Sequence, residues 1–187
     1  MKTSINFKAA KSDSEIHNFR KKSFDYIRKD LTHKNEYWME QKIADRLLKI
    51  ESYCKEKSGR KLQKNAMPIR EAVVVIKENT TMQDLHNLSK RLEEELNIRI
   101  FQIAIHKDEG HYDKDTKEWK PNYHAHLVAD WQDLQTGKTL KHQSFHYSKM
   151  QDLAAECLEM ERGVSGSLAR LEAVEFKIKK KEEDLKI

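Results

Sequence analysis

Apolar residues recur along this chain with two periods, which predict strands and helices in irregular alternation. Residues 4–9 alternate apolar and polar side chains, as in a strand with one buried face. Residues 69–76 form a nearly continuous apolar run, which predicts a strand buried on both faces. Further strands are expected over 98–106 and 122–131. Apolar residues at helical spacing predict one or two short basic helices over 15–31, then helices over 37–57, 81–96, 144–163 and 168–187.

Strands and helices in this order do not form a regular βα repeat. The expected fold is therefore α+β, with an antiparallel β-sheet flanked by helices and a charged helix at the C-terminal end. We interpret residues 1–167 as one domain. Residues 168–187 are a charged helical tail that we expect to begin a longer helix or coiled coil.

Composition narrows the functional class only slightly. Lysine and arginine total 36 against 31 acidic residues, a balance that mildly favours a polyanionic partner. The cysteines, Cys54 and Cys157, have no CxxC spacing and lie on apolar helix faces, so buried free thiols are expected. No apolar run is long enough to span a bilayer, and the N-terminus lacks a signal-peptide core. A reducing, cytoplasmic setting is expected.

The strongest chemical signal is a pair of histidines, His124 and His126, within the strand predicted over 122–131. Residues two apart in a strand point to the same face, so the two imidazoles project side by side. His106 ends the preceding strand. If these strands are neighbours joined by a polar excursion over 107–121, the three imidazoles converge as in a catalytic metal site with open positions. Imidazole suits zinc, manganese and other divalent ions, and isolated surface or core histidines are the simpler alternative.

Several residues near this site are candidates for supporting or catalytic roles. Glu109 follows His106 by three positions and could accept a ring N–H, although a solvated loop carboxylate has the same spacing. A metal beside a basic surface suits phosphoryl transfer, which requires a nucleophile. His17, Tyr26 and Tyr37 lie near basic residues, and an exposed helix histidine is the alternative for His17.

Basic clusters interleaved with aromatic residues indicate nucleic-acid binding. Phosphate contacts from lysine and arginine make such binding sensitive to salt, and exposed aromatic rings can stack on bases. A solvated helix face is the alternative for any such cluster. The residues expected to contact DNA are Lys21, Lys22, Arg28, Arg60, Lys61, Lys64 and Trp119.

Three segments together resemble a known family. His17-Asn18-Phe19-Arg20, then His106-Lys107-Asp108-Glu109, then Pro121 to His126 are similar to the HNxR and HxDExxPHxH motifs of the MOBV (Mob/Pre) relaxases, which are HUH-type nicking enzymes of mobilizable plasmids and transposons. Residues 160–164 resemble a later family segment, and the resemblance extends to about residue 167. Two departures are clear. Residues 110–123 separate Glu109 from His124, whereas the family motif is contiguous, and Pro121 stands three residues before His124 and not directly before it.

The resemblance implies a function and a role for each matching residue. A relaxase binds single-stranded and hairpin DNA at an origin of transfer, nicks one strand and stays linked to the 5′ phosphate. This reaction initiates conjugation and horizontal gene transfer, with proteins of the conjugation machinery as further partners. His17 would be the nucleophile, Arg20 would stabilise phosphate charge, and Glu71 would orient His17 or take its proton. Mn²⁺ or Mg²⁺ would be held by His106, His124 and His126, with Glu109 and Asn18 in support.

Other interpretations of the sequence remain open. Tyr26 competes with His17 as nucleophile, since most HUH relaxases use tyrosine. An HUH replication initiator or transposase would use the same chemistry in another pathway. A DNA-binding module with a structural zinc is a different class, but no fourth ligand is well placed for it. A regulator that binds its own promoter is a further alternative.

Overall fold

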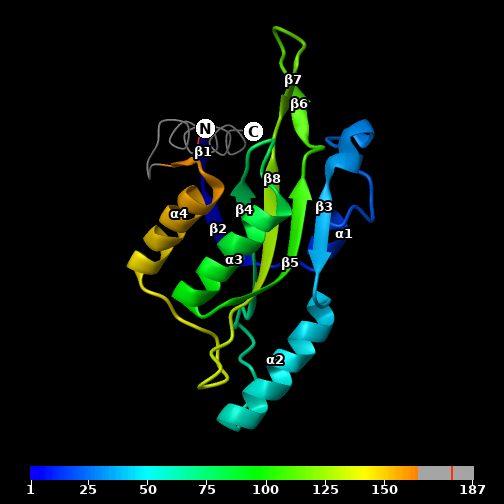
Figure 1. Ribbon diagram of the computed structural model, residues 1–187. Coiled ribbons are helices and arrows are strands. Elements are labelled where there is room, and N and C mark those ends of the chain that lie inside the picture. The colour runs from blue at the N-terminus through cyan, green and yellow to red at the C-terminus, as the bar shows by residue number, and fades with distance from the viewer. Residues whose placement is uncertain (164–177, 179–187) are drawn as a thin grey trace.

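The computed structural model of the protein describes residues 1–163 and residue 178 (Figure 1). Its centre is a sheet of five strands in which every neighbouring pair is antiparallel. This confirms the α+β class predicted from the sequence. The strands, in spatial order, are β2 (Ile5–Ala9), β4 (Ile69–Val75), β8 (His124–Asp130), β5 (Arg99–His106) and β3 (Glu36–Met39). The predicted helical tail over 168–187 lies outside the described residues, apart from residue 178.

Helices and short ribbons surround this sheet. The helices are α1 (Ser14–Asn18), the 3₁₀ helix η1 (Lys29–Lys34), α2 (Ile43–Ser58), α3 (Met82–Leu96) and α4 (Ser144–Leu158). A parallel pair joins β1 (Lys2–Thr3) to β9 (Glu161–Arg162). The predicted polar excursion is a hairpin of β6 (Gly110–Tyr112) and β7 (Trp119–Pro121), which projects beyond the sheet (Figure 1).

One face of the sheet packs against α3 and α4, which lie side by side in front of it (Figure 1). Helix α3 begins where the side chains and backbone N–H groups of Thr81 and Asp84 form a reciprocal capping box. Its leucines recur every three or four residues, so they form one stripe that faces the core. Alternate residues of β8, including Leu127, contribute the opposing side of this main core.

The other face of the sheet is only partly covered. Helix α2 packs a small second core against it, built around Ile50, Phe101 and Val128. His124 and His126 lie on this second face because they share the parity of Val128. Val73, on the same face of β4, is 49% exposed. The prediction that residues 69–76 are buried on both faces is therefore wrong at this position.

Two helix predictions also need correction. Residues 36–39 form the edge strand β3 and not the start of a helix, and Trp38 pairs with Ile103 of β5. The Trp38 side chain packs on the main core, and an apolar residue at this position is compatible with a helix as well as with a strand. The region over 15–31 contains only the five-residue α1 before η1 begins at Lys29. Among the described residues, no helix has the length and apolar character needed to cross a membrane.

Candidate active site and metal centre

Three histidines converge where β5 and β8 pair. His106 lies directly opposite His124 in the antiparallel register, and His126 follows two residues later on the same face. The ring centroids of the three histidines lie 4.7–5.1 Å apart. All three residues are buried. The predicted convergence across the hairpin insertion is therefore present in the fold, because β5 and β8 are neighbours and the hairpin leaves their register intact.

Each of these rings has one nitrogen held by an acceptor outside the cluster. His106 Nε2 lies 2.7 Å from the Asn18 carbonyl oxygen, and His124 Nδ1 lies 2.8 Å from the Asn122 carbonyl oxygen. His126 Nδ1 lies 2.6 Å from Glu71 Oε1. Since carbonyl and carboxylate oxygens only accept, the ring nitrogens must donate, and each bond fixes the position of the ring proton.

The remaining nitrogens of the three rings therefore present lone pairs to one another. His106 Nδ1 and His124 Nε2 lie 3.2 Å apart, and neither has a proton to place between them. His126 Nε2 is buried and has no hydrogen-bond partner within the described part of the chain. Facing lone pairs and an unpartnered buried acceptor are costly unless a cation lies between them. The donor set and its outer hydrogen bonds thus fit a divalent metal ion.

Two overlapping sets of atoms could hold such an ion. Nitrogens of His17, His106 and His126 lie within 4.8 Å of one another, and so do ligand atoms of His106, Glu109 and His124. The three predicted ligands are divided between these sets, with His106 common to both. Glu109 Oε2 lies 3.2 Å from His124 Nε2, the unprotonated nitrogen, so Glu109 occupies the position of a further ligand and not that of an outer acceptor.

The electrostatics of the cluster keep two of its rings uncharged without a metal. Burial, together with neighbouring His126 and Arg20, lowers the pKa of His106 to about 2. Burial also lowers the pKa of His124, against the attraction of Glu109. Neutral imidazoles are the form that binds metal, so His106 and His124 do not have to lose protons near pH 7 before an ion enters.

Glu71 connects the metal cluster to the helix that carries His17. It accepts hydrogen bonds from His126, from Ser14 Oγ at 2.6 Å and from Asn18 Nδ2 at 2.9 Å. Burial alone would raise the Glu71 pKa, but these bonds outweigh it and lower the pKa to about 2. The described hydrogen bonds of Glu71 do not include His17. Its position is that of an acceptor that orients His126 and holds α1, and Asn18 lies where a supporting residue was expected.

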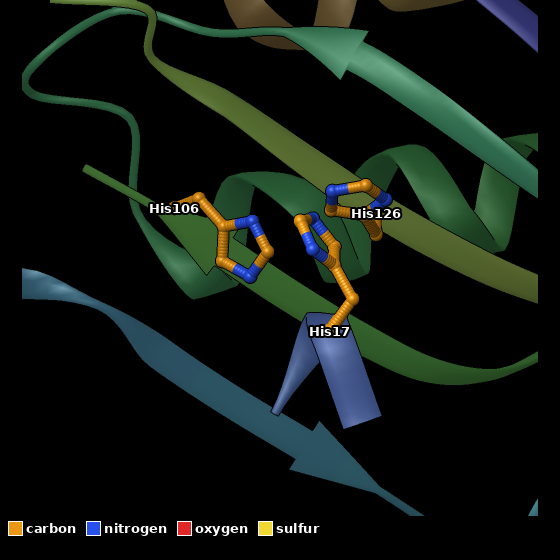
Figure 2. Close-up of side chains that lie close together, drawn as sticks. All are labelled: His17, His106 and His126. Carbon is orange, nitrogen blue, oxygen red and sulfur yellow. The ribbon is translucent and has the colours of Figure 1, made fainter. Parts of the chain in front are cut away.

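His17 lies on α1, and its ring is close to those of His106 and His126 (Figure 2). Its ring centroid is 5.5 Å from that of His106 and 5.4 Å from that of His126. Its side chain is 24% exposed, the most exposed of the four histidines here. Burial lowers the His17 pKa, although Glu109 opposes the shift. A neutral, accessible imidazole is the form that can attack an electrophile.

Tyr26, the competing nucleophile, contacts His17 directly. The Tyr26 hydroxyl lies 3.1 Å from His17 Nδ1, while His17 Nε2 lies 3.5 Å from Glu109 Oε1. Partial burial and the nearby Glu109 raise the pKa of Tyr26. A raised pKa makes the phenolate less accessible, so the environment favours His17 over Tyr26 as the attacking group.

Arg20 is tied into the protein by most of its donors. Its Nε and Nη2 atoms donate to both oxygens of Asp108, Nη2 also reaches Glu109, and Nη1 donates to the His17 carbonyl oxygen. Asp108 is fully buried, and no role was predicted for it from the sequence. Its place between His106 and Glu109 was the available signal, since a carboxylate beside a buried ligand needs a cationic partner. Arg20 therefore has a structural role in this site, and its expected role in stabilising phosphate charge stays a prediction.

The residues expected to contact DNA fall into two regions. Lys21 and Lys22 line a small pocket beside Arg20, and the Arg28 guanidinium lies 5.1 Å from the centre of the Trp119 ring on the hairpin. The basic loop that contains Arg60, Lys61 and Lys64 leads into the start of β4. His124 pairs with Val75, the last residue of β4, so this loop is at the opposite end of the strand from the histidines.

Comparison with solved structures identifies similar folds. One is a Mn-bound crystal structure of the MobM relaxase domain (MOBV; Mob_Pre) with plasmid pMV158 oriT DNA of 22 nt at pH 5.5, with a TM-score of 0.63 at 15% identity over 93% of this chain and 100% of that one. The Mn-bound complex at pH 4.6 gives 0.64 at 16% identity over 90% of this chain and 94% of that one. A complex with 26 nt of the same oriT gives 0.52 at 12% identity over 90% and 94%.

Sequence comparison gives no such match: no protein-family model and no curated protein matches this chain. The likeness to the solved structure of the complex at pH 5.5 nevertheless covers 93% of this chain and 100% of that one. The resemblance inferred from the three sequence segments is thereby confirmed at the level of the fold. At identities of 12–16% the likeness establishes the architecture, and this chain has the fold of the MOBV relaxase domain.

Proposed function

We propose that this protein is a relaxase that makes a metal-dependent, strand-specific nick in DNA at an origin of transfer. The observation that carries the proposal is the set of three buried histidines whose outer nitrogens are all held by acceptors and whose inner lone pairs converge beside His17. This is the arrangement of a catalytic metal site with a nucleophile at its edge. The MobM domains of the same fold are bound to oriT DNA, and several are Mn-bound.

The proposed ligands are His106, His124 and His126, with Glu109 beside them and Mn²⁺ or Mg²⁺ as the ion. When bound there, a divalent ion would polarise a phosphoryl oxygen of the DNA. Glu71, through its bond to His126, and the Asn18 carbonyl, through its bond to His106, keep two ligand rings in one orientation.

His17 is the proposed nucleophile. With Nδ1–H donated to the Tyr26 hydroxyl, Nε2 presents its lone pair on the side of Glu109 and the cluster. Nε2 attacks the scissile phosphorus, a P–N bond forms, and the P–O3′ bond breaks. One strand end leaves with a 3′ hydroxyl, which takes its proton from water, and the 5′ phosphate stays on the protein as a phosphoramidate. Arg20 supports the reaction by holding Glu109 and the His17 carbonyl in place.

The remaining predictions belong to the same proposal. Single-stranded and hairpin DNA is the expected substrate, contacted by Lys21, Lys22, Arg28 and Trp119 near the site, and by the loop of Arg60, Lys61 and Lys64 at a distance. Proteins of the conjugation machinery are expected partners. We propose that residues 1–167 form the nicking domain. Residues 168–187, for which the sequence predicts a charged helical tail, lie outside the described residues apart from residue 178.

Nicking of supercoiled DNA that carries the cognate origin tests the proposal. Mn²⁺ should convert supercoiled plasmid to the relaxed form, and chelation should abolish the conversion. The His106→Ala variant should lose activity, whereas His33→Ala, an exposed histidine on η1, should retain it. Specific DNA binding without any nicking in Mn²⁺ would instead favour a DNA-binding module with a structural metal.

A further inference from the structure

The uncovered part of the second sheet face forms a groove beside His17. Its volume is about 470 Å³, and it is lined by residues of β2, β4 and α1, by the segment that follows α1 and by His126 of β8. His17 and Tyr26 are both part of this lining. The lining also includes strand residues that have no part in the metal site, among them Asn6 and Val73, so the groove is larger than the chemistry at His17 requires.

The floor of the groove is apolar. Val73 is 49% exposed although β4 is an interior strand, with β2 on one side and β8 on the other. The exposed Asn6 pairs with Val73 across the two strands and lies next to it on the floor. An open valine beside an amide provides a flat surface with one hydrogen-bonding group, which suits the face and edge of a nucleobase.

One wall of the groove is aromatic. The rings of Phe24 and Tyr26 are stacked, with centroids 5.5 Å apart and planes inclined by 11°. Phe24 also lies 5.5 Å from the His17 ring, and Tyr26 bonds to it. Aromatic side chains are the usual platforms for single-stranded bases, and these two are fixed in position against the proposed nucleophile.

The rim of the groove carries two exposed lysines, Lys8 and Lys11. Neither forms an ion pair within the part of the chain that the structure describes. Two acidic residues are on the same lining: Asp13 is exposed, and the Glu71 carboxylate already accepts hydrogen bonds from His126, Ser14 and Asn18. Two free ammonium groups beside an apolar and aromatic channel complement a sugar–phosphate backbone.

We infer that this groove holds the nucleotide adjacent to the scissile phosphate. Its base lies over Val73 and against the Phe24–Tyr26 wall, Asn6 contacts the base edge, and Lys8 and Lys11 contact the phosphates. The inference rests on the proposed function and extends it, because it gives the substrate strand a path across β2 and β4 and assigns selectivity for one nucleotide to residues outside the metal site.

Binding of a fluorescent oligo(dT) of about twelve nucleotides, measured by anisotropy, tests the groove without requiring catalysis. Val73→Asp should weaken binding about tenfold, since it removes the apolar floor and repels phosphate. Leu48→Asp is the matched control, because Leu48 is an exposed apolar residue on α2 and should have no effect. Thermal melts of both variants show whether the fold is kept.

The lysines are tested by the salt dependence of the same binding. The combined Lys8→Ala and Lys11→Ala variant should reduce the slope of log Kd against log salt by about 0.7 for each phosphate contact that is lost. Lys90→Ala, an exposed lysine on α3 at the opposite face of the sheet, should leave the slope unchanged.

Photo-crosslinking identifies the wall directly. Oligo(dT) with 5-iododeoxyuridine should crosslink to the peptide that contains Phe24 and Tyr26. Three results together would overturn the groove: the wild-type protein binds the oligonucleotide, Val73→Asp binds it with the same affinity, and crosslinks form only to the hairpin over 110–121. The relaxase proposal would remain standing in that case. Wild-type protein that fails to bind single-stranded DNA would refute both.

Discussion

Replacing Glu71 by glutamine tests the way in which the metal ligands are held. The Glu71 carboxylate accepts bonds from His126 Nδ1, Ser14 Oγ and Asn18 Nδ2. The substitution keeps the shape of the side chain but removes its charge and one of its two acceptor oxygens. His126 and Asn18 both donate to Oε1, and Ser14 donates to Oε2. The glutamine oxygen is an uncharged and weaker acceptor at either position, and the amide N–H₂ replaces the acceptor at the other.

The expected cost has two parts. The lowered pKa of Glu71, about 2, shows that the folded protein favours the carboxylate over the neutral acid. Losing a buried hydrogen bond to a charged group lowers the free energy of unfolding by about 2 kcal/mol. Loss of an outer acceptor typically weakens metal binding by about ten- to a hundredfold, which is about 1.4–2.7 kcal/mol.

Mn²⁺ affinity, measured from the electron paramagnetic resonance signal of the free ion, separates the two parts. Ser14→Ala removes one bond to Glu71 without touching His126, so Mn²⁺ affinity should stay near that of wild type. Glu94→Gln, on the exposed side of α3, controls for net charge. A folded Glu71→Gln protein with wild-type Mn²⁺ affinity would refute the role of Glu71 in orienting His126.

Three further outcomes are expected. Arg20→Lys should lower the free energy of unfolding by about 2 kcal/mol in urea denaturation, because lysine cannot form the bidentate bond to the buried Asp108; an unchanged midpoint would contradict this. Metal-free protein should lose stability as pH falls below about 6.5, by up to about 1.4 kcal/mol per pH unit for each histidine. The reason is that His106 and His124 have lowered pKa values in the folded protein, so the unfolded chain takes up protons that the folded chain does not. An unchanged urea midpoint between pH 7 and pH 5 would contradict this prediction. Trp119→Ala should weaken binding of single-stranded DNA by about fivefold in the anisotropy assay, whereas Thr116→Ala at the hairpin tip should not.

The parts of the fold predicted correctly are those with strong local signals. Helix α3 has a capping box and an unbroken leucine stripe, so its start and face follow from the sequence. His124 and His126 lie on the same face of β8, as their spacing of two residues predicts. Their proximity to His106 was predicted by treating residues 107–121 as an insertion between two neighbouring strands. These elements could be predicted from the sequence because their local propensities and their tertiary contacts favour the same structure.

The errors have a common origin in contacts between distant segments. Trp38 fits a helical stripe equally well, and only pairing with β5 makes residues 36–39 a strand. Val73 belongs to an apolar run that suggests two buried faces, but none of the helices in the described residues covers its side chain, which is exposed. Arg20 and Asp108 are 88 positions apart, so no local pattern identifies Arg20 as the partner, although the place of Asp108 between His106 and Glu109 indicated that it needs one.

The roles of His17 and Tyr26 depend on the same kind of long-range geometry. The sequence placed both near a basic segment and left the nucleophile open. The structure adds the hydrogen bond between them and shows that both line the same groove. The positions of the two side chains favour His17 as the nucleophile. Identifying the residue that carries the covalent DNA adduct would decide between them.

Peptide mapping of the protein–DNA adduct is the most direct test of the account. Wild-type protein, incubated with Mn²⁺ and a single strand that spans the cognate nick site, is digested and sequenced by mass spectrometry. The account predicts an acid-labile phosphoramidate on His17, joined to the 5′ end of the cleaved strand and absent from the His17→Ala variant. An acid-stable adduct on Tyr26, retained in His17→Ala, would contradict it.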